Sequence, residues 1–253
     1  MANNIANKLI VNAKSEAEID DFLRAIEGEG EENDTKLHID FERIIPMPEV
    51  LQDIKCDTEH HNALYYFLMT TSKEGLVDKL LSHSQFYNMD KFKDKTEEEL
   101  AHYKELGEEL YKVSLKYGCY NWYDWRIYNW GTKWNAYDTY IESVGGGSVE
   151  LYFYTAWNSP TPILLKLAEM FPNLTFIYKY ADEDMTYNCG EGYGEDGYMS
   201  FSFAEGGSDD AMEIYVECWQ EDWDCFKKTE NGWQYDWGDD EDEDEDDDEE
   251  ENE

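Results

Sequence analysis

The sequence predicts an α+β fold in which an antiparallel sheet is packed against helices. A strand–helix–strand pattern opens the chain over residues 8–42, and a second one occupies residues 148–180. Between them, two strand patterns are joined by Gly145, Gly146 and Gly147, which indicates an antiparallel hairpin. The hairpin favours an α+β fold over a doubly wound parallel sheet.

The first pattern rests on hydrophobic spacing. Residues 8–13 form a short apolar run that is typical of a strand. Ser15 and Glu18 form a capping box that begins a helix, and Gly28 is suited to end it. Residues 37–42 alternate apolar and polar side chains, which predicts a half-buried strand.

A long helical stretch is predicted at about residues 57–118. Apolar residues recur there at helical spacing in three segments. Thr96 begins the last segment with a capping box, and Gly118 is suited to end it in a left-handed conformation. We therefore predict a helical insertion within a single domain over residues 1–237.

The second half supplies further strands and helices. In order, we predict strands at 134–144 and 148–157, a helix at 163–171, strands at 174–180 and 198–204, and a helix at 208–219. Residues 190–197 contain a glycine pattern that resembles a nucleotide-binding loop, but no helix follows and its acidic side chains would repel a phosphate. We predict a turn-rich hairpin loop there. The two halves together predict a split β-α-β, ferredoxin-like sheet with helices on one face.

The charge of the chain is strongly acidic, with 60 Asp and Glu against 20 Lys and Arg. Residues 239–253 carry 14 acids and no base, so we predict a disordered acidic tail at 238–253. The rest of the chain keeps 46 acids and 20 bases, a formal charge of −26. Direct binding of nucleic acid or of an anionic membrane is excluded, because it needs clustered Lys and Arg. The charge would attract basic protein surfaces and divalent cations, and a role in solubility alone would also explain it. A basic protein surface is the partner that we predict.

The cysteines and the hydropathy pattern indicate where in the cell the protein is expected. The five cysteines form an odd number with no CxxC, which indicates reduced thiols rather than a disulfide framework. No secretory signal pattern opens the sequence, and no apolar run approaches the ~20 residues that span a bilayer. These observations predict a cytoplasmic location.

An aromatic block, NWYDWRIYNWGTKWNAYD at residues 121–138, holds four of the nine tryptophans. As a structural element it would begin at Asn121, end at Gly131 and join the core, with Arg126 and Lys133 stacked on ring faces. As a functional element it would form a concave platform for a ligand or a peptide. The wall of that platform would consist of Trp130, Lys133, Trp134 and Asn135.

The same block carries a family resemblance. With the later segment ELYFYTAWNSPTPILLKLAEMFPNLTF and the earlier IDFERIIPMPE, it resembles the phage and plasmid family of Api92-like proteins with a YubB ferredoxin-like domain. The resemblance covers most of residues 5–205. It implies a ferredoxin-like fold and a mobile-element context, and it implies no catalytic residues.

No cofactor or metal site is predicted. His60 and His61 lie near Cys56, but adjacent histidines point to different helix faces, so we interpret them as the start of a helix. Cys218 and Cys225 lie seven residues apart without a neighbouring His, and we interpret them as buried thiols. Weak calcium binding is a residual hypothesis for five acids around the glycine pattern, and it lacks EF-hand spacing. Those acids are Asp182, Glu183, Asp184, Glu191 and Asp196.

Two functions follow as hypotheses. The first is a non-enzymatic acidic protein that binds a basic host partner, with DNA mimicry against a nuclease or another defence protein as one version. The second is a small-molecule or nucleotide-processing enzyme that uses an aromatic pocket around Trp130 and Asn135.

Overall fold

The computed structural model describes residues 3–28, 39–81 and 88–236. Its helices and strands, with three short 3-10 helices labelled η, follow in chain order: β1 (Asn4–Asn12), α1 (Glu16–Ile26), α2 (Phe41–Ile44), α3 (Glu49–Gln52), α4 (Thr58–Thr70), η1 (Glu74–Leu76), α5 (Val77–Leu80), η2 (Met89–Phe92), α6 (Glu97–Tyr117), α7 (Trp122–Trp130), β2 (Tyr137–Gly145), β3 (Ser148–Ala156), α8 (Thr161–Met170), β4 (Thr175–Asp182), β5 (Gly190–Glu195), β6 (Tyr198–Phe203), α9 (Asp209–Trp219), η3 (Trp223–Cys225), β7 (Phe226–Thr229) and β8 (Gly232–Tyr235).

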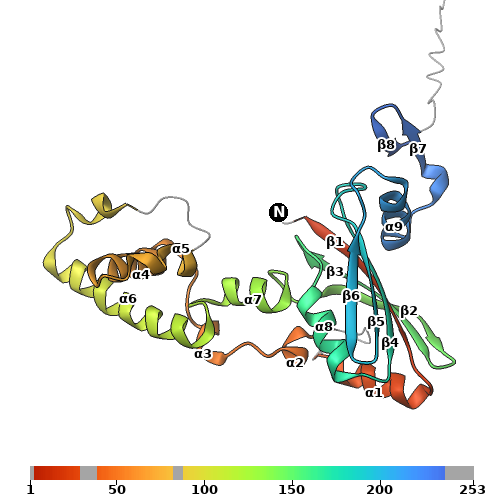
Figure 1. Cartoon of the computed structure of the whole chain (residues 1–253), viewed down its shortest axis with the longest axis horizontal. Coiled ribbons are helices and arrows are strands. Elements are labelled where there is room, and N and C mark those ends of the chain that lie inside the picture. The colour runs from red at the N-terminus through yellow and green to blue at the C-terminus, as the bar shows by residue number, and fades with distance from the viewer. Residues whose placement is uncertain (1–2, 29–38, 82–87, 237–253) are drawn as a thin grey trace, which may run out of the picture.

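The main sheet has six strands in the order β2-β3-β1-β4-β5-β6, and all neighbours are antiparallel (Figure 1). β1 lies between β3 and β4, while α1 precedes β2 and α8 connects β3 to β4. This is the split β-α-β arrangement, so the predicted ferredoxin-like fold is confirmed. β5 and β6 extend the sheet beyond its first four strands.

The two faces of the sheet are covered differently. Side chains of a strand alternate between faces, so Leu9 and Val11 lie in the core with α1 and α8, whereas Ala6 lies in a second buried cluster with α9. We predicted helices on one face only, and α9 corrects this. Most of its side chains are buried, including Met212 and Tyr215, so the helix needs apolar contacts on several sides.

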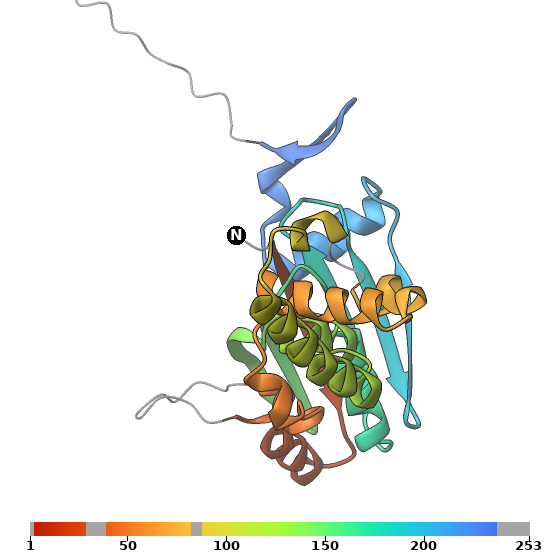
Figure 2. The same cartoon turned by 90° about the vertical axis from the view of Figure 1, so that its left-hand side faces the viewer.

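The helical part of the chain has its own buried cluster. Ala63, Leu64 and Phe67 of α4 pack with Leu110 of α6, and Figure 2 shows the two helices side by side. The predicted capping box of α6 is present, and Gly118 ends the helix with φ 82°. Figure 1 places this part away from the sheet, with α7 between them.

The predicted strand at residues 37–42 is wrong in its described part. Residues 37–38 lie outside the described ranges, Ile39 forms an isolated bridge with Glu27, and α2 begins at Phe41. Asp40 caps α2 by accepting a hydrogen bond from the Glu42 N–H. Because β2 is the second strand of the fold, the helices α2 to α7 are inserted inside the first β-α-β unit, rather than between the two halves.

The glycine pattern is also corrected, because β5 occupies most of the predicted loop. A two-residue turn, Asp196 and Gly197, joins β5 to β6. A Cβ atom on Gly192 would lie 2.9 Å from the Phe201 ring, so the glycine leaves the space in which that ring packs. The predicted tail at residues 238–253 lies outside the described residues.

Candidate functional site

The aromatic block forms α7 and the turn that follows it. The Asn121 side chain accepts a hydrogen bond from the Asp124 N–H at 2.9 Å, and Gly131 ends the helix with φ 81°. A Cβ atom on Gly131 would lie 2.9 Å from Pro162 Cδ and from the Ser159 carbonyl oxygen. The end of α7 therefore packs closely against the start of α8, and the predicted end of the helix at Gly131 is confirmed.

Two tryptophans of the block belong to the core. Trp125 and Trp130 are buried, with ring centroids 6.0 Å apart, and Trp130 Nε1 donates to the Ile45 carbonyl oxygen at 2.9 Å. Arg126 stacks on Trp130, with its guanidinium carbon 4.7 Å from the ring centroid. Burial lowers the pKa of Arg126, and Glu42, 3.9 Å away, opposes that shift.

The four candidate residues do not share a cavity wall. Trp130 is fully buried, whereas Trp134 is 42% exposed. The Asn135 side chain is used within the fold: its oxygen accepts from the Phe41 N–H at 2.8 Å, and its amide donates to Asp40 at 2.8 Å. A binding role for the four residues therefore remains a prediction.

Lys133 lies among three aromatic rings. Its Nζ is 4.8 Å from the Trp134 ring centroid, 5.1 Å from Trp157 and 5.9 Å from Tyr123. The expected stacking of Arg126 and Lys133 on ring faces is thus confirmed. These rings offer a site for a cation, and the protein's own lysine occupies it.

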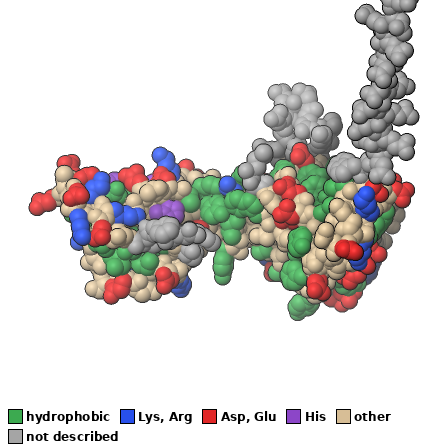
Figure 3. Space-filling view, turned by 90° about the horizontal axis from the view of Figure 1, so that it is seen from above, with side chains coloured by type: hydrophobic (Ala, Val, Ile, Leu, Met, Phe, Trp, Pro, Cys, Tyr) green, Lys and Arg blue, Asp and Glu red, His purple; other side chains and the backbone are tan. Residues whose placement is uncertain are grey.

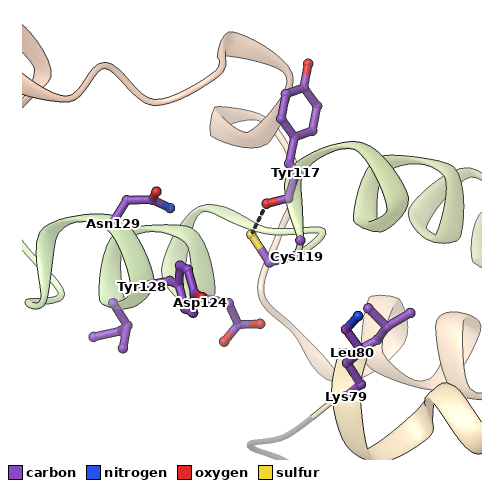
Figure 4. A pocket seen from close by; sticks show the side chains of 9 residues that line it. Lys79, Leu80, Tyr117, Cys119, Asp124, Tyr128 and Asn129 are labelled. Atoms are coloured by element: carbon purple, nitrogen blue, oxygen red, sulfur yellow. Dashed lines mark hydrogen bonds between the residues drawn. The ribbon is translucent and has the colours of Figure 1, made fainter. Parts of the chain in front are cut away.

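A cavity of about 510 Å³ lies beside the block, between α5 and α7 (Figure 4). Its lining residues are Lys79, Leu80, Tyr117, Gly118, Cys119, Asp124, Ile127, Tyr128 and Asn129. Burial raises the pKa of Cys119 to about 11, so its thiol stays protonated near neutral pH. Asp124 accepts from the Asn121 side chain at 2.8 Å. The cavity could hold a small molecule, but it contains no activated thiolate.

A second cleft, of about 490 Å³, lies between α9 and the sheet, and we call it the α9 cleft. It is lined by Tyr152, Lys179, Glu213, Val216, Glu217, Gln220, Glu221 and Trp223. Tyr152 stacks on Tyr140, with ring centroids 5.3 Å apart, and Tyr140 donates to the Gln220 side chain. The cleft thus combines carboxylates with aromatic rings.

The basic side chains near the α9 cleft already have acidic partners. Lys8 Nζ lies 2.9 Å from carboxylate oxygens of Glu150 and Glu217, and Lys179 pairs with Glu217. Burial opposes the charge of Lys8, but its hydrogen bonds to these glutamates raise the pKa above its ordinary value. Burial raises the pKa of Glu217, and the two lysines more than reverse this, so the net shift is downward.

The remaining carboxylates of the cleft are not neutralised in this way. Across the described ranges, neither Glu213 nor Glu221 forms an ion pair, and Glu221 accepts only a 3.5 Å bond from the Tyr235 hydroxyl. On α9, Asp209, Glu213 and Glu217 recur at a spacing of four residues, which places them on one stripe. This spacing is the sequence signal that could have identified the cleft.

The residual metal hypotheses find no support. In the described part of the chain, no three His, Cys, Asp or Glu side chains come together to hold an ion. Asp182 instead accepts hydrogen bonds from the side chains of Asn3 and Asn188. His60 and His61 lie in the first turn of α4, as expected for a helix start, and His60 Nδ1 is 2.7 Å from Asp57. Cys218 is buried as predicted, but Cys225 is exposed, because it lies in the short helix η3 after α9 has ended. Among the described helices, none has the length and apolar character needed to cross a membrane.

The sheet and its helices define a ferredoxin-like α+β domain. Residues 129–231 match a family model described as the ferredoxin-like domain in Api92-like protein. This part of the chain is therefore similar to the ferredoxin-like domain of Api92-like proteins. The match begins at the end of α7 and reaches the β7–β8 turn, so it includes the α9 cleft.

A crystal structure of a protein api92 from Yersinia pseudotuberculosis has a TM-score of 0.38 and 9% sequence identity, over 81% of this chain and 99% of that chain. The comparison with curated proteins gives no match.

Proposed function

We propose that this protein is a non-enzymatic binding protein whose α9 cleft receives a Lys or Arg side chain of a basic partner protein. One observation carries the proposal: the cleft places Glu213 and Glu221, which lack ion-pair partners within the described residues, beside the rings of Tyr152 and Trp223. Carboxylates together with an aromatic face suit a guanidinium group, which can pair with acids and stack on a ring.

The net charge supports the same function at longer range. A formal charge of −40 attracts a basic partner and raises its association rate, and the effect weakens as salt is added. Following the family resemblance, we place the protein in the cytoplasm of a bacterium that carries a phage or plasmid. DNA mimicry is one version of this function, in which the partner binds DNA.

The enzyme alternative receives less support. Its four residues, Trp130, Lys133, Trp134 and Asn135, do not line the α9 cleft or the cavity beside Cys119. It stays a prediction.

The test uses two matched double variants and an arginine-rich peptide as the probe. E213Q/E221Q removes two carboxylates from the cleft, whereas E105Q/E109Q removes two exposed carboxylates from α6 and leaves the same net charge. We expect the cleft variant to bind the peptide about tenfold more weakly, since two partly exposed ion pairs together contribute about 1.4 kcal/mol. Isothermal titration at low salt measures both affinities.

Equal losses in the two double variants would contradict the proposal, because the peptide would then respond to net charge alone. The DNA-mimic version has its own control. If a partner captured from host lysate at low salt binds this protein and DNA through the same surface, added duplex DNA should release it.

A further inference from the structure

The two edges of the sheet differ in how well they are protected. On the β2 edge, the pairing with β3 shifts register between Tyr137 and Tyr140 and again after Ile141. Asp138 adopts a positive φ of 48°, and β2 also carries Glu142. Irregular pairing and charged side chains are the usual means by which an edge strand avoids pairing with another chain.

The β6 edge has none of these features. Its sequence, YMSFSF, contains no charged residue and no proline, and its register with β5 is regular. Tyr198 is 82% exposed and Phe203 is 76% exposed. Within the described ranges, β6 pairs with β5 and with no other strand. A regular, uncharged edge of this kind is a template for a further strand.

The hydrogen-bonding groups that face outward from β6 can be identified. The Ala204 N–H donates to the Cys189 carbonyl oxygen of the preceding segment at 3.1 Å. Backbone groups alternate in direction along an antiparallel strand, so the even-numbered residues of β6 bond to β5. The N–H and C=O groups of Met199, Phe201 and Phe203 therefore face the open edge.

The edge is held in an extended conformation by the residues beneath it. The β5–β6 turn has positive φ at both central residues, 52° at Asp196 and 82° at Gly197, which suits a tight hairpin. Phe201 packs over Gly192 and meets the Tyr178 ring edge to face, with centroids 6.3 Å apart. An added strand would thus find its template already formed, which lowers the cost of ordering.

Acidic side chains surround this neutral strand. Glu191 and Glu195 lie on β5, Asp196 lies in the turn, and Glu205 follows β6, and all four are exposed. We propose that β6 binds an extended basic segment of a partner protein by strand addition. The inference rests on the proposed function, because it names a second surface on which the same class of partner docks.

A second copy of the chain fits this edge less well. If two β6 strands paired antiparallel about Phe201, Met199 would lie opposite Phe203, and Glu205 would lie opposite Gly197, next to Asp196 of the other chain. Like charges would then meet at both ends of the paired strands, which is destabilising. A basic segment would instead meet acids at both ends.

The test uses a blocked eight-residue peptide of alternating lysine and valine as the probe. We expect it to bind the full-length protein at low salt and to slow amide exchange about tenfold at Met199, Phe201 and Phe203. The same peptide with glutamate in place of lysine should not bind. Residue-resolved amide exchange by NMR locates the bound peptide.

Two changes at Phe203 separate backbone pairing from side-chain contact. Phe203→Pro removes an outward N–H and should weaken binding about fivefold beyond Phe203→Ala, which keeps that N–H. Phe203→Lys places a like charge beside the peptide and should also weaken binding, so the test does not depend on the folding of the proline variant.

The outcomes distinguish the two proposals. Salt-sensitive binding of the lysine peptide with unchanged exchange at β6 would overturn strand addition and leave the proposed function intact. Failure of both this peptide and the arginine-rich peptide to bind would overturn both. In the absence of peptide, the three amides could become more protected as the protein concentration rises, with dimers seen by sedimentation. That result would overturn the proposal, because it would show that a second copy of the chain occupies the edge.

Discussion

At the scale of single residues, Asn135 shows how a candidate binding group becomes part of the fold. Its carboxamide bonds to the N–H groups of Phe41 and Ala136 and to the Asp40 carboxylate. It therefore joins the start of α2 to the segment that leads into β2. A carboxamide is needed here because it supplies an acceptor and a donor at once.

We predict that Asn135→Asp destabilises the protein by about 2 kcal/mol at neutral pH, because a carboxylate would face the Asp40 carboxylate. Like charge raises the folded-state pKa of the introduced carboxyl group above its unfolded value. The penalty is therefore complete above the raised pKa and is relieved as pH falls toward the ordinary value of about 4. Urea unfolding of the variant and the wild type at a series of pH values measures the difference. A penalty that does not depend on pH would contradict this explanation.

The sequence could predict the burial of this block only in part. Its helix, its Asn121 cap and its Gly131 end follow from residue types at fixed positions. The division between buried Trp130 and exposed Trp134 does not, because it depends on how the chain turns after Gly131 and packs against α8. The grouping of all four candidate residues on one wall assumed that sequence neighbours share a surface.

At the scale of elements, the contact between α4 and α6 depends on one glycine. A Cβ atom on Gly107 of α6 would lie 2.1 Å from the Ala63 carbonyl oxygen and 2.6 Å from Phe67 Cβ in α4. Neither atom can move without a shift of the α4 backbone. The glycine therefore sets the distance between the two helices.

We predict that Gly107→Ala destabilises the protein by about 2 kcal/mol, although alanine favours a helix interior by about 1 kcal/mol. Gly75→Ala is the matched control, since nothing lies within 4 Å of the added Cβ atom. Thermal unfolding followed by circular dichroism compares the two. A stabilised Gly107 variant would mean that α4 and α6 are not in close contact.

The spacing of hydrophobic residues alone could not decide between a strand at residues 37–42 and the start of a helix. A short alternation of Ile39 and Phe41 also fits a chain that turns into α2, where Phe41 and Ile44 lie one turn apart and are both buried. The Asn135 side chain accepts the Phe41 N–H from 94 residues away, and no local pattern contains that partner. The strands β1, β3 and β4 could be predicted, because each has a long apolar face in one core.

At the scale of the whole molecule, the acidic charge could be predicted from composition, whereas its use could not. Lys8 and Lys179 both pair with Glu217, whereas Glu213 has no such partner among the described residues. The sequence does not reveal this difference, because each of these ion pairs joins residues more than 30 positions apart. In Figure 3, acidic side chains lie at both ends of the molecule, and hydrophobic ones gather in the narrow middle, where Figure 1 places α7. Charge alone therefore does not locate a binding surface.

Deleting the acidic tail would separate the effect of net charge from the effect of specific contacts in the α9 cleft. Deletion of residues 239–253 removes 14 acids and changes the formal charge from −40 to −26. If the α9 cleft carries the specific contacts, the deletion should slow association with the arginine-rich peptide and leave the dissociation rate nearly unchanged, because long-range charge acts mainly on the encounter. The affinity should fall less than about threefold at 0.1 M salt, where the screening length is about 10 Å. Stopped-flow and surface plasmon resonance measure both rates.

The cleft variant E213Q/E221Q should instead raise the dissociation rate of the peptide, and the increase should be the same with and without the tail. A tail deletion that abolishes binding would transfer the interaction from the cleft to the tail.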